Sequence, residues 1–215
     1  MNFFDVLIDT EEREAMAARV QGVVVGVVTN NQDPEGMGRV KVKFPWLSDE
    51  DESQWARLAT PMAGNKRGIY FLPEVDDEVL VAFEHGDVRF PYVLGALWNG
   101  KDAPPGTNDD GKNNLRLIHS RSGHLIKLSD EDGKEKIEVI DKSTKNSIVI
   151  DTAKNTITIT SDKDIVLTAA QGTIKLDAQK IELKSSADTK LEAGAGMEVK
   201  ASATMNIKGA TVNIN

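Results

Sequence analysis

The sequence lacks several things that would point to particular chemistries. It contains no cysteine, which excludes disulfide bonds and a thiolate nucleophile and leaves both reducing and oxidising compartments open. Lys and Arg number 26 against 34 Asp and Glu, a net charge of -8, and no basic stripe is present, so the balance disfavours a nucleic-acid binder. No apolar run is long enough to span a bilayer.

The N-terminal 20 residues read as a short arm. They lack a basic start and a small-residue cleavage site, so no signal peptide is expected. Thr10 is a candidate N-cap for a helix through Ala15–Arg19. The helix is expected either to pack on its own domain or to act as a docking arm for a neighbouring protein.

Residues 21–100 hold all three Trp, both Tyr, four of the six Phe and five of the seven Pro. Short runs rich in β-branched residues alternate there with turn signals, and "GRVKVKF" places Val40 and Val42 against Lys41 and Lys43, as in a half-buried strand. "FEHGDVRF" predicts a hairpin closed around Gly86. Five or six strands in about eighty residues predict a small closed barrel, because closure removes exposed strand edges.

Residues 101–114, rich in Pro, Gly, Asn and Asp, are predicted to be a linker. From residue 115 to 215 the chain contains no aromatic residue and no proline. Residues 115–147 read as strands joined by Asp-Gly and Lys-Asn turns and form a predicted β junction region.

A repeat of about eight residues covers 148–215. Its units begin seven to nine residues apart, at Ile148, Ile157, Ile165, Ile174, Ile181, Thr189, Met197, Met205 and Val212. Positions 1 and 3 of each unit (octad) are mostly aliphatic, positions 2 and 4 become mostly charged or polar, and position 5 is usually small. Alternate residues of a strand point to opposite faces, so positions 1, 3 and 5 are predicted to face inward. The other three residues form a corner.

Such octads build either a β-helix from one chain or an intertwined rod from three. A single three-walled chain needs about 24 residues per coil and would complete fewer than three coils with both ends open. Three copies give a rod roughly 40 Å long at about 4.8 Å per strand, with an axis suited to aliphatic side chains. The homotrimer is the preferred interpretation. Its predicted core consists of Ile148, Ile150, Ile157, Ile159, Ile165, Leu167, Ile174, Leu176, Ile181, Leu183, Leu191, Met197, Val199, Met205 and Ile207.

Residues 22–100 resemble the OB-fold domain of phage baseplate protein gpV and of VgrG, the spike proteins of contractile injection machines. The resemblance is carried by Asp33-Pro34, Gly38-Arg39-Val40, Phe44-Pro45-Trp46, Trp55-Ala56-Arg57, Ala63-Gly64, Pro73, Glu78-Val79, Gly86-Asp87, Pro91 and Gly95. The octad rod is the second mark of that family. It implies an all-β fold: an N-terminal OB barrel followed by an intertwined triple-stranded β-helix. Asp76 stands where the family often has glycine, and the turn is expected to survive because Asp tolerates a left-handed backbone.

The resemblance implies a structural, membrane-piercing central spike of a phage tail, tailocin or related secretion system. It would assemble in the producer's cytoplasm, join the tail or baseplate, and reach the target envelope. VgrG has a hub region before its OB domain, whereas about twenty residues precede it here, so the expected hub is a separate trimeric protein. The chain ends on a bare strand, and the resemblance implies a PAAR-type tip protein docked on Thr211, Val212, Asn213, Ile214 and Asn215.

No catalytic, metal-binding or cofactor-binding residue is predicted. The three His residues, 85, 119 and 124, show no metal-ligand spacing, and the acidic run 48–53 reads as a solvated loop. Trp46, Trp55 and Trp98 are expected to pack in the core, with stacking on bases or sugars as the alternative. Two rival functions stay open: a trimeric carbohydrate-binding fibre, which the lack of aromatics after residue 115 disfavours, and an OB-fold nucleic-acid binder, which the acidic charge disfavours.

Overall fold

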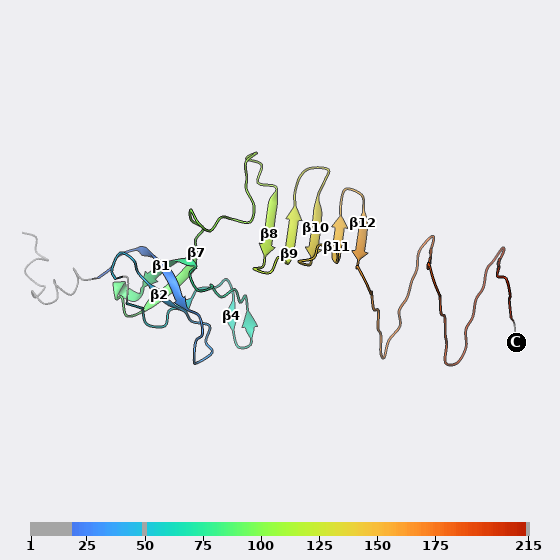
Figure 1. The fold of residues 1–215 in the computed structure, drawn as a ribbon, viewed down its shortest axis with the longest axis horizontal. Helices are drawn as coiled ribbons and strands as arrows, with labels where there is room; N and C mark the ends of the chain where they lie inside the picture. The colour runs from blue at the N-terminus through green and yellow to red at the C-terminus, as the bar shows by residue number, and fades with distance from the viewer. Residues whose placement is uncertain (1–18, 49–50, 214–215) are drawn as a thin grey trace, which may run out of the picture. The chain divides into compact units, whose positions relative to one another are not determined.

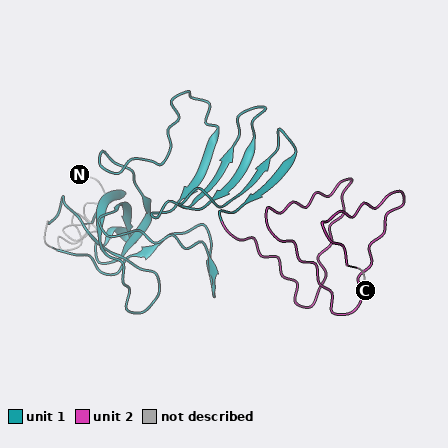
Figure 2. Cartoon of the chain, turned by 45° about the vertical axis from the view of Figure 1, so that its right-hand side comes forward, with its two compact units in different colours: residues 1–162 teal, residues 163–215 magenta. Residues whose placement is uncertain are grey.

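The computed structural model describes residues 19–48 and 51–213, so the predicted helix of the N-terminal arm falls outside the described residues except for Arg19. The chain divides into two compact units, residues 1–162 and 163–215 (Figure 2). The first unit contains two five-stranded sheets, and each is described in turn (Figure 1).

The first sheet has the strand order β2-β1-β6-β7-β3. All neighbouring strands are antiparallel except β3 and β7, which are parallel. The strands are β1 (Val23–Asn30), β2 (Lys41–Lys43), β3 (Arg57–Leu58), β6 (Glu78–Phe83) and β7 (Pro91–Ala96), with the small hairpin β4 (Ala63–Gly64) and β5 (Arg67–Gly68) inserted after β3.

The two edge strands of this sheet meet and close it into a barrel. Val40, just before β2, forms an antiparallel bridge with Ala56, just before β3, through N–O hydrogen bonds of 3.0 and 2.7 Å. A second bridge joins Lys43 and Glu52. The barrel predicted from the sequence is therefore confirmed.

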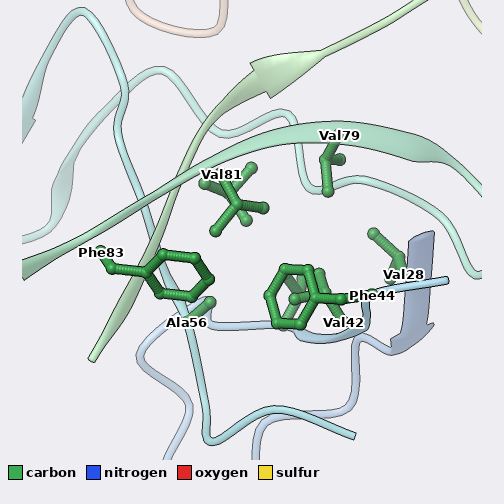
Figure 3. Packing of buried hydrophobic residues seen from close by; sticks show 9 residues of the cluster. Val28, Val42, Phe44, Ala56, Val79, Val81 and Phe83 are labelled. Atoms are coloured by element: carbon green, nitrogen blue, oxygen red, sulfur yellow. The ribbon is translucent and has the colours of Figure 1, made fainter. Parts of the chain in front are cut away.

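The barrel core is small and mostly β-branched, as alternation along the strands requires (Figure 3). In β6, Val79, Val81 and Phe83 point inward, and the Phe83 ring meets Phe44 edge-on with centroids 5.3 Å apart. Gly26 leaves room for the Phe44 ring, because a Cβ there would lie 3.2 Å from it. The other fully buried members are Val28, Val40, Val42, Ala56 and Val93.

Two turns of the barrel match their predictions. Asp76 has φ +75°, in the left-handed region, and its N–H donates to the carbonyl of Val28 at 2.9 Å, so this turn does accept Asp. The β6–β7 hairpin closes through a short 3-10 turn, η2 (Glu84–Gly86), and Phe83 lies opposite Pro91.

The second sheet is an antiparallel meander in strand order β12-β11-β10-β9-β8. Its strands are β8 (Leu115–His119), β9 (Leu125–Ser129), β10 (Lys136–Ile140), β11 (Ser147–Asp151) and β12 (Thr156–Thr160). The sheet thus includes residues 148–160, which the octad pattern assigned to the rod. Alternation is the same on both sides of residue 148, so the sequence contains no signal for where the meander ends.

In the second unit, residues 163–213 are extended segments joined by bends, and the described part contains no strand. Every side chain described there is exposed. Extended segments that do not pair as strands leave backbone groups without ladder partners, which is costly in a folded protein. The predicted intertwined β-helix would provide these partners from other copies, and it stays a prediction.

Candidate interaction surface

One face of the β8–β12 sheet is aliphatic and exposed. Strand register forms two cross-strand rows, which together define the aliphatic face. The first row is Ile118, Ile126, Val139, Ile148 and Ile159, and the second is Leu128, Ile137, Ile150 and Ile157. Their exposed fractions run from 38% to 70%. Contiguous apolar surface of this kind marks an interaction site, because soluble proteins rarely leave it uncovered.

The opposite face of the same sheet carries charged pairs among its strands. Lys127 and Glu138 lie directly opposite each other, with Nζ 3.0 Å from Oε2. Lys136 pairs in the same way with Asp151 at 3.5 Å. Burial opposes ionisation of Asp151, but the Lys154 N–H and the charges of Lys154 and Lys136 outweigh it, so the pKa of Asp151 lies below its usual value. The two faces therefore differ in character, and the aliphatic one is the candidate surface.

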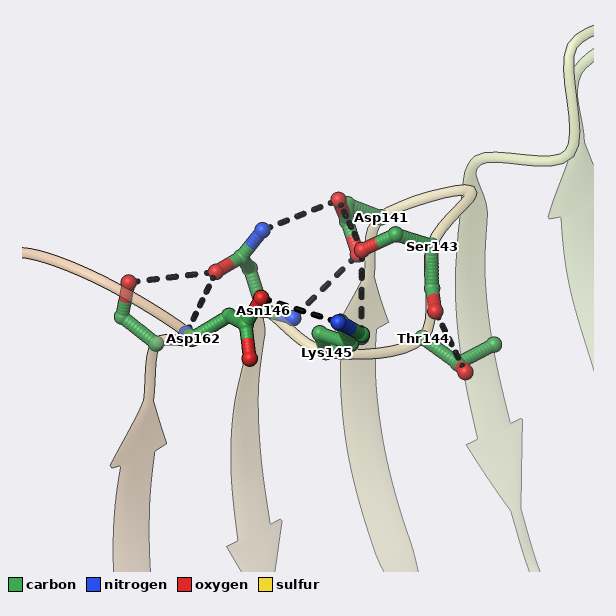
Figure 4. A network of polar contacts seen from close by, with 7 residues as sticks. Asp141, Ser143, Thr144, Lys145, Asn146 and Asp162 are labelled. Atoms are coloured by element: carbon green, nitrogen blue, oxygen red, sulfur yellow. Dashed lines mark hydrogen bonds and ion pairs between the residues drawn. The ribbon is translucent and has the colours of Figure 1, made fainter.

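A polar network fixes the place where the chain leaves the sheet (Figure 4). Asp141 accepts hydrogen bonds from the Asn146 side chain at 3.0 Å and from Ser143 Oγ at 2.8 Å, and these lower the pKa of Asp141 to about 2. Asn146 Oδ1 accepts from Ser161 Oγ and from the Asp162 N–H, both at 3.1 Å. The β10–β11 turn is thereby tied to the residues after β12.

The predicted core residues are distributed over both units. Four of them, Ile148, Ile150, Ile157 and Ile159, lie together on the aliphatic face. The remaining eleven, from Ile165 to Ile207, lie in the second unit with exposed fractions of 46% to 76%, and a single chain does not bring them into a core. Of the predicted tip residues, Thr211, Val212 and Asn213 are exposed, and Ile214 and Asn215 lie outside the described residues.

Sequence reasoning missed more than half of the aliphatic face. Ile118, Ile126, Leu128, Ile137 and Val139 belong to it, yet the core was counted only from Ile148. The signal was present in "LIKLS" and "KIEVI", which show the same alternation as the octads.

The expected core packing of the tryptophans is wrong for two of them. Trp46 is 51% exposed and Trp98 is 69% exposed. Trp55 is half-buried, with the charges of Arg39 and Lys41 at 5.8 and 5.6 Å from its ring centroid. The interior of this small barrel is already filled by Val and Phe side chains, so it has no volume left for indole rings.

The barrel surface also carries a cleft beside Trp55. In it, Arg57 stacks on the ring of Tyr92 at 4.6 Å, and the Tyr92 hydroxyl donates to Glu84 at 2.6 Å. These contacts form a polar patch on the barrel surface. Across the described ranges, no three His or acidic side chains come together as a metal site, and no helix has the length and apolar character to cross a membrane.

Comparison with known proteins identifies the barrel. Residues 24–98 match the model of the type VI secretion system/phage-baseplate injector OB domain. These residues span β1 to β7 and contain the whole buried core.

Several curated relatives share more than the barrel. The type VI secretion system spike protein VgrG3 of Vibrio cholerae serotype O1 (El Tor Inaba N16961) is 31% identical over 137 residues, 58% of this chain and 14% of the relative. The actin cross-linking toxin VgrG1 of V. cholerae O395 is 30% identical over 131 residues, 55% of this chain and 12% of the relative. The spike protein VgrG1a of Pseudomonas aeruginosa PAO1 is 27% identical over 141 residues, which are 59% of this chain and 22% of the relative.

The matched regions cover less than a quarter of each of these relatives, so activities named for the whole relatives do not transfer with the match. The family model assigns the injector OB domain to residues 24–98, and the closed barrel and its core lie in this stretch. Residues 24–98 are therefore an injector OB domain of the type VI secretion system/phage-baseplate kind, in a chain that is similar to VgrG spike proteins over rather more than half of its length.

Proposed function

We propose that this protein is the homotrimeric central spike of a contractile phage tail, tailocin or related secretion system. The observation that carries the proposal is the aliphatic face, whose nine residues are uncovered in a single chain. Burying one such side chain fully recovers about 1.5–3 kcal/mol, and three sheets packed around one axis would cover all three faces at once.

The extended second unit supports the same architecture. Its aliphatic residues alternate with charged ones and are exposed in one chain. Three intertwined copies would pair every backbone segment laterally and leave no free edge along the rod, which suits a structure that carries axial force. The rod then acts mechanically, by piercing, and performs no bond chemistry.

Three partners follow from this role. The OB domain docks on a trimeric baseplate hub, and a PAAR-type tip protein binds residues 211–215 by strand addition, since Val212 is apolar and 48% exposed. The target envelope is contacted on piercing. The assembly forms in the producer's cytoplasm before it joins the tail or baseplate.

The decisive measurement is the mass of the protein in solution. Three chains of 23.4 kDa give about 70 kDa, and light scattering at micromolar concentration should report this value. Ile137→Asp places a charge on the aliphatic face and should prevent assembly, because an unpaired charge is costly to bury.

Thr158→Asp is the matched control for Ile137→Asp. It introduces the same charge on the same sheet, but Thr158 lies opposite Val149 on the other face. The control should remain trimeric. A folded wild-type monomer would exclude the proposed architecture, and equal behaviour of the two variants would exclude the aliphatic face as its interface.

A further inference from the structure

The outward charges of the octads reverse sign from one unit to the next. In the unit that begins at Ile174, positions 2 and 4 are Lys175 and Asp177. The next three units continue the alternation with Glu182 and Lys184, Lys190 and Glu192, and Glu198 and Lys200. Both positions therefore alternate strictly through four octads, and a solvated surface without a partner has no need of such order.

In three of the four octads the structure pairs the two charged positions on one side of the chain, and in the other octad Glu182 pairs with Lys180. Lys175 Nζ lies 3.0 Å from Asp177 Oδ2, and Lys190 pairs in the same way with Glu192. Glu198 and Lys200 form a third such pair. Side chains two residues apart meet only when they share a face of an extended segment. The charges thus form two outer rows, position 2 and position 4, with the aliphatic positions on the other side.

The geometry of the proposed trimer decides which octads become neighbours, and the present inference rests on that proposal. Three copies related by a threefold axis wind in the same sense, and each chain moves to the next wall at every corner. At one strand spacing of about 4.8 Å per octad, the strand above any octad is the following octad of a neighbouring copy, in parallel.

We infer that the two charged rows stabilise this one-octad stagger between copies. Along position 2 the cross-strand neighbours become Lys175–Glu182, Glu182–Lys190 and Lys190–Glu198. Along position 4 they become Asp177–Lys184, Lys184–Glu192 and Glu192–Lys200. All six contacts within these four octads join opposite charges, and such cross-strand pairs stabilise a sheet whereas like charges directly opposite destabilise it.

Other parallel registers are less favourable. Pairing the same octad of two copies, or octads two apart, places like charges opposite each other in both rows. A single chain coiled on itself would pair octads three apart. That register gives only two opposite-charge contacts within the four octads, Lys175–Glu198 and Asp177–Lys200. The pattern thus favours the one-octad stagger.

Disulfide trapping tests the stagger directly, because the chain has no cysteine of its own. The double variant Asp177→Cys/Lys184→Cys should, on oxidation, form a ring of three intermolecular bonds and run as a covalent trimer on a non-reducing denaturing gel. Neighbouring strands lie within the Cα separation that a disulfide requires. Each single variant should yield no cross-linked species.

The alternative outcomes separate this inference from the proposed function. A native trimer whose double variant does not cross-link, or whose single Asp177→Cys variant forms dimers, overturns the stagger and leaves the trimer standing. A monomer in which Asp177→Cys/Lys200→Cys forms an internal disulfide overturns both the inferred stagger and the proposed trimer.

A charge-reversal pair provides an independent test of register. Lys184→Glu would lie between Asp177 and Glu192 and should lower the melting temperature of the trimer. Lys208 occupies position 4 of the octad that follows Lys200. Lys208→Glu therefore replaces a like-charge contact with an opposite-charge one and should raise the melting temperature. The two variants change net charge equally, and both effects should shrink at high salt. Shifts of the same sign would contradict the inferred register.

Discussion

Asp33 and Arg39 are joined through both sides of the arginine fork: Nε lies 3.0 Å from Asp33 Oδ2, and Nη2 lies 2.8 Å from Oδ1. The same carboxylate accepts backbone N–H groups of Glu35, Met37 and Arg39. The Arg39 bond and these backbone donors hold the pKa of Asp33 well below its usual range. One carboxylate therefore holds the turn from Asp33 to Arg39 in the β1–β2 loop.

Replacing Asp33 with Asn should therefore lower the melting temperature of the OB domain. The amide keeps the shape of the side chain but loses the charge that Arg39 and the three N–H groups share. Glu35→Gln is the control, since Glu35 contacts Arg39 from an exposed position at 3.3 Å. Thermal unfolding followed by circular dichroism should show the larger loss for Asp33→Asn, and equal losses would contradict the role assigned to Asp33.

Acid should destabilise the folded chain through carboxyl groups whose pKa is depressed in the native state. The pKa of Asp87 is lowered to about 2 by Arg89, and that of Asp141 to about 2 by Asn146 and Ser143. A depressed folded-state pKa contributes stability above the unfolded value near 4, and this contribution disappears as pH falls through about 2. Denaturant titrations at several pH values should show stability falling between these limits.

Asp141→Asn isolates one of these contributions. The variant cannot ionise at this position, so it should be less stable than wild type at neutral pH. Because wild-type Asp141 becomes neutral as well in acid, the difference should close towards pH 2. A difference that does not depend on pH would show that the carboxylate charge contributes nothing.

Leu176 and Lys175 test the inward and outward assignment within the rod. Leu176→Asp would bring three charges together at the axis of the proposed trimer, at several kcal/mol each, and should abolish trimerisation. Lys175→Ala removes an exposed side chain paired with Asp177 and should change stability by about 0.5 kcal/mol or less. Size-exclusion chromatography with light scattering distinguishes the variants, and the same result for both would reverse the assignment.

Removal of the residues after Gly209 should abolish capture of a PAAR-type protein without dissociating the trimer. The deleted segment contains Val212, the exposed apolar residue of the proposed docking site, while almost all octads remain. A pull-down with full-length and truncated protein measures this, with mass determined in parallel. Equal capture by both would place the docking site elsewhere.

The sequence predicted the barrel well because its signals are local. Alternation at Val40 and Val42, the turn at Asp76 and the hairpin at Gly86 all appear in the structure. The Asp33–Arg39 pair could not be derived from spacing, because the loop geometry that brings them together is not periodic. The prediction for Trp46 and Trp98 is wrong because hydrophobicity alone does not distinguish a core ring from an exposed one.

For the candidate surface, the alternation of apolar and polar residues indicates which residues share a face, but it does not indicate what covers that face. Ile148 to Ile159 were identified, whereas Ile126 and Val139 were overlooked because their hairpins precede the regular octads. What lies over a face is a property of the assembly. The structure of a single chain therefore shows the aliphatic face, whereas the partner that covers this face has to be proposed.

The contrast between the β8–β12 meander and the segments after Asp162 implies an order of folding. Each meander strand pairs with its sequence neighbour, so the loops to be closed are short and a single chain can form the sheet rapidly. Residues 163–213 form no strand within one chain, and in the proposed trimer their strands pair only with those of other chains. In the proposed trimer, the three folded meanders would therefore associate first. The rod would then wind from Asp162 towards its tip. The fast-folding strands β8–β12 would thus set the register for the slow, intermolecular winding that follows.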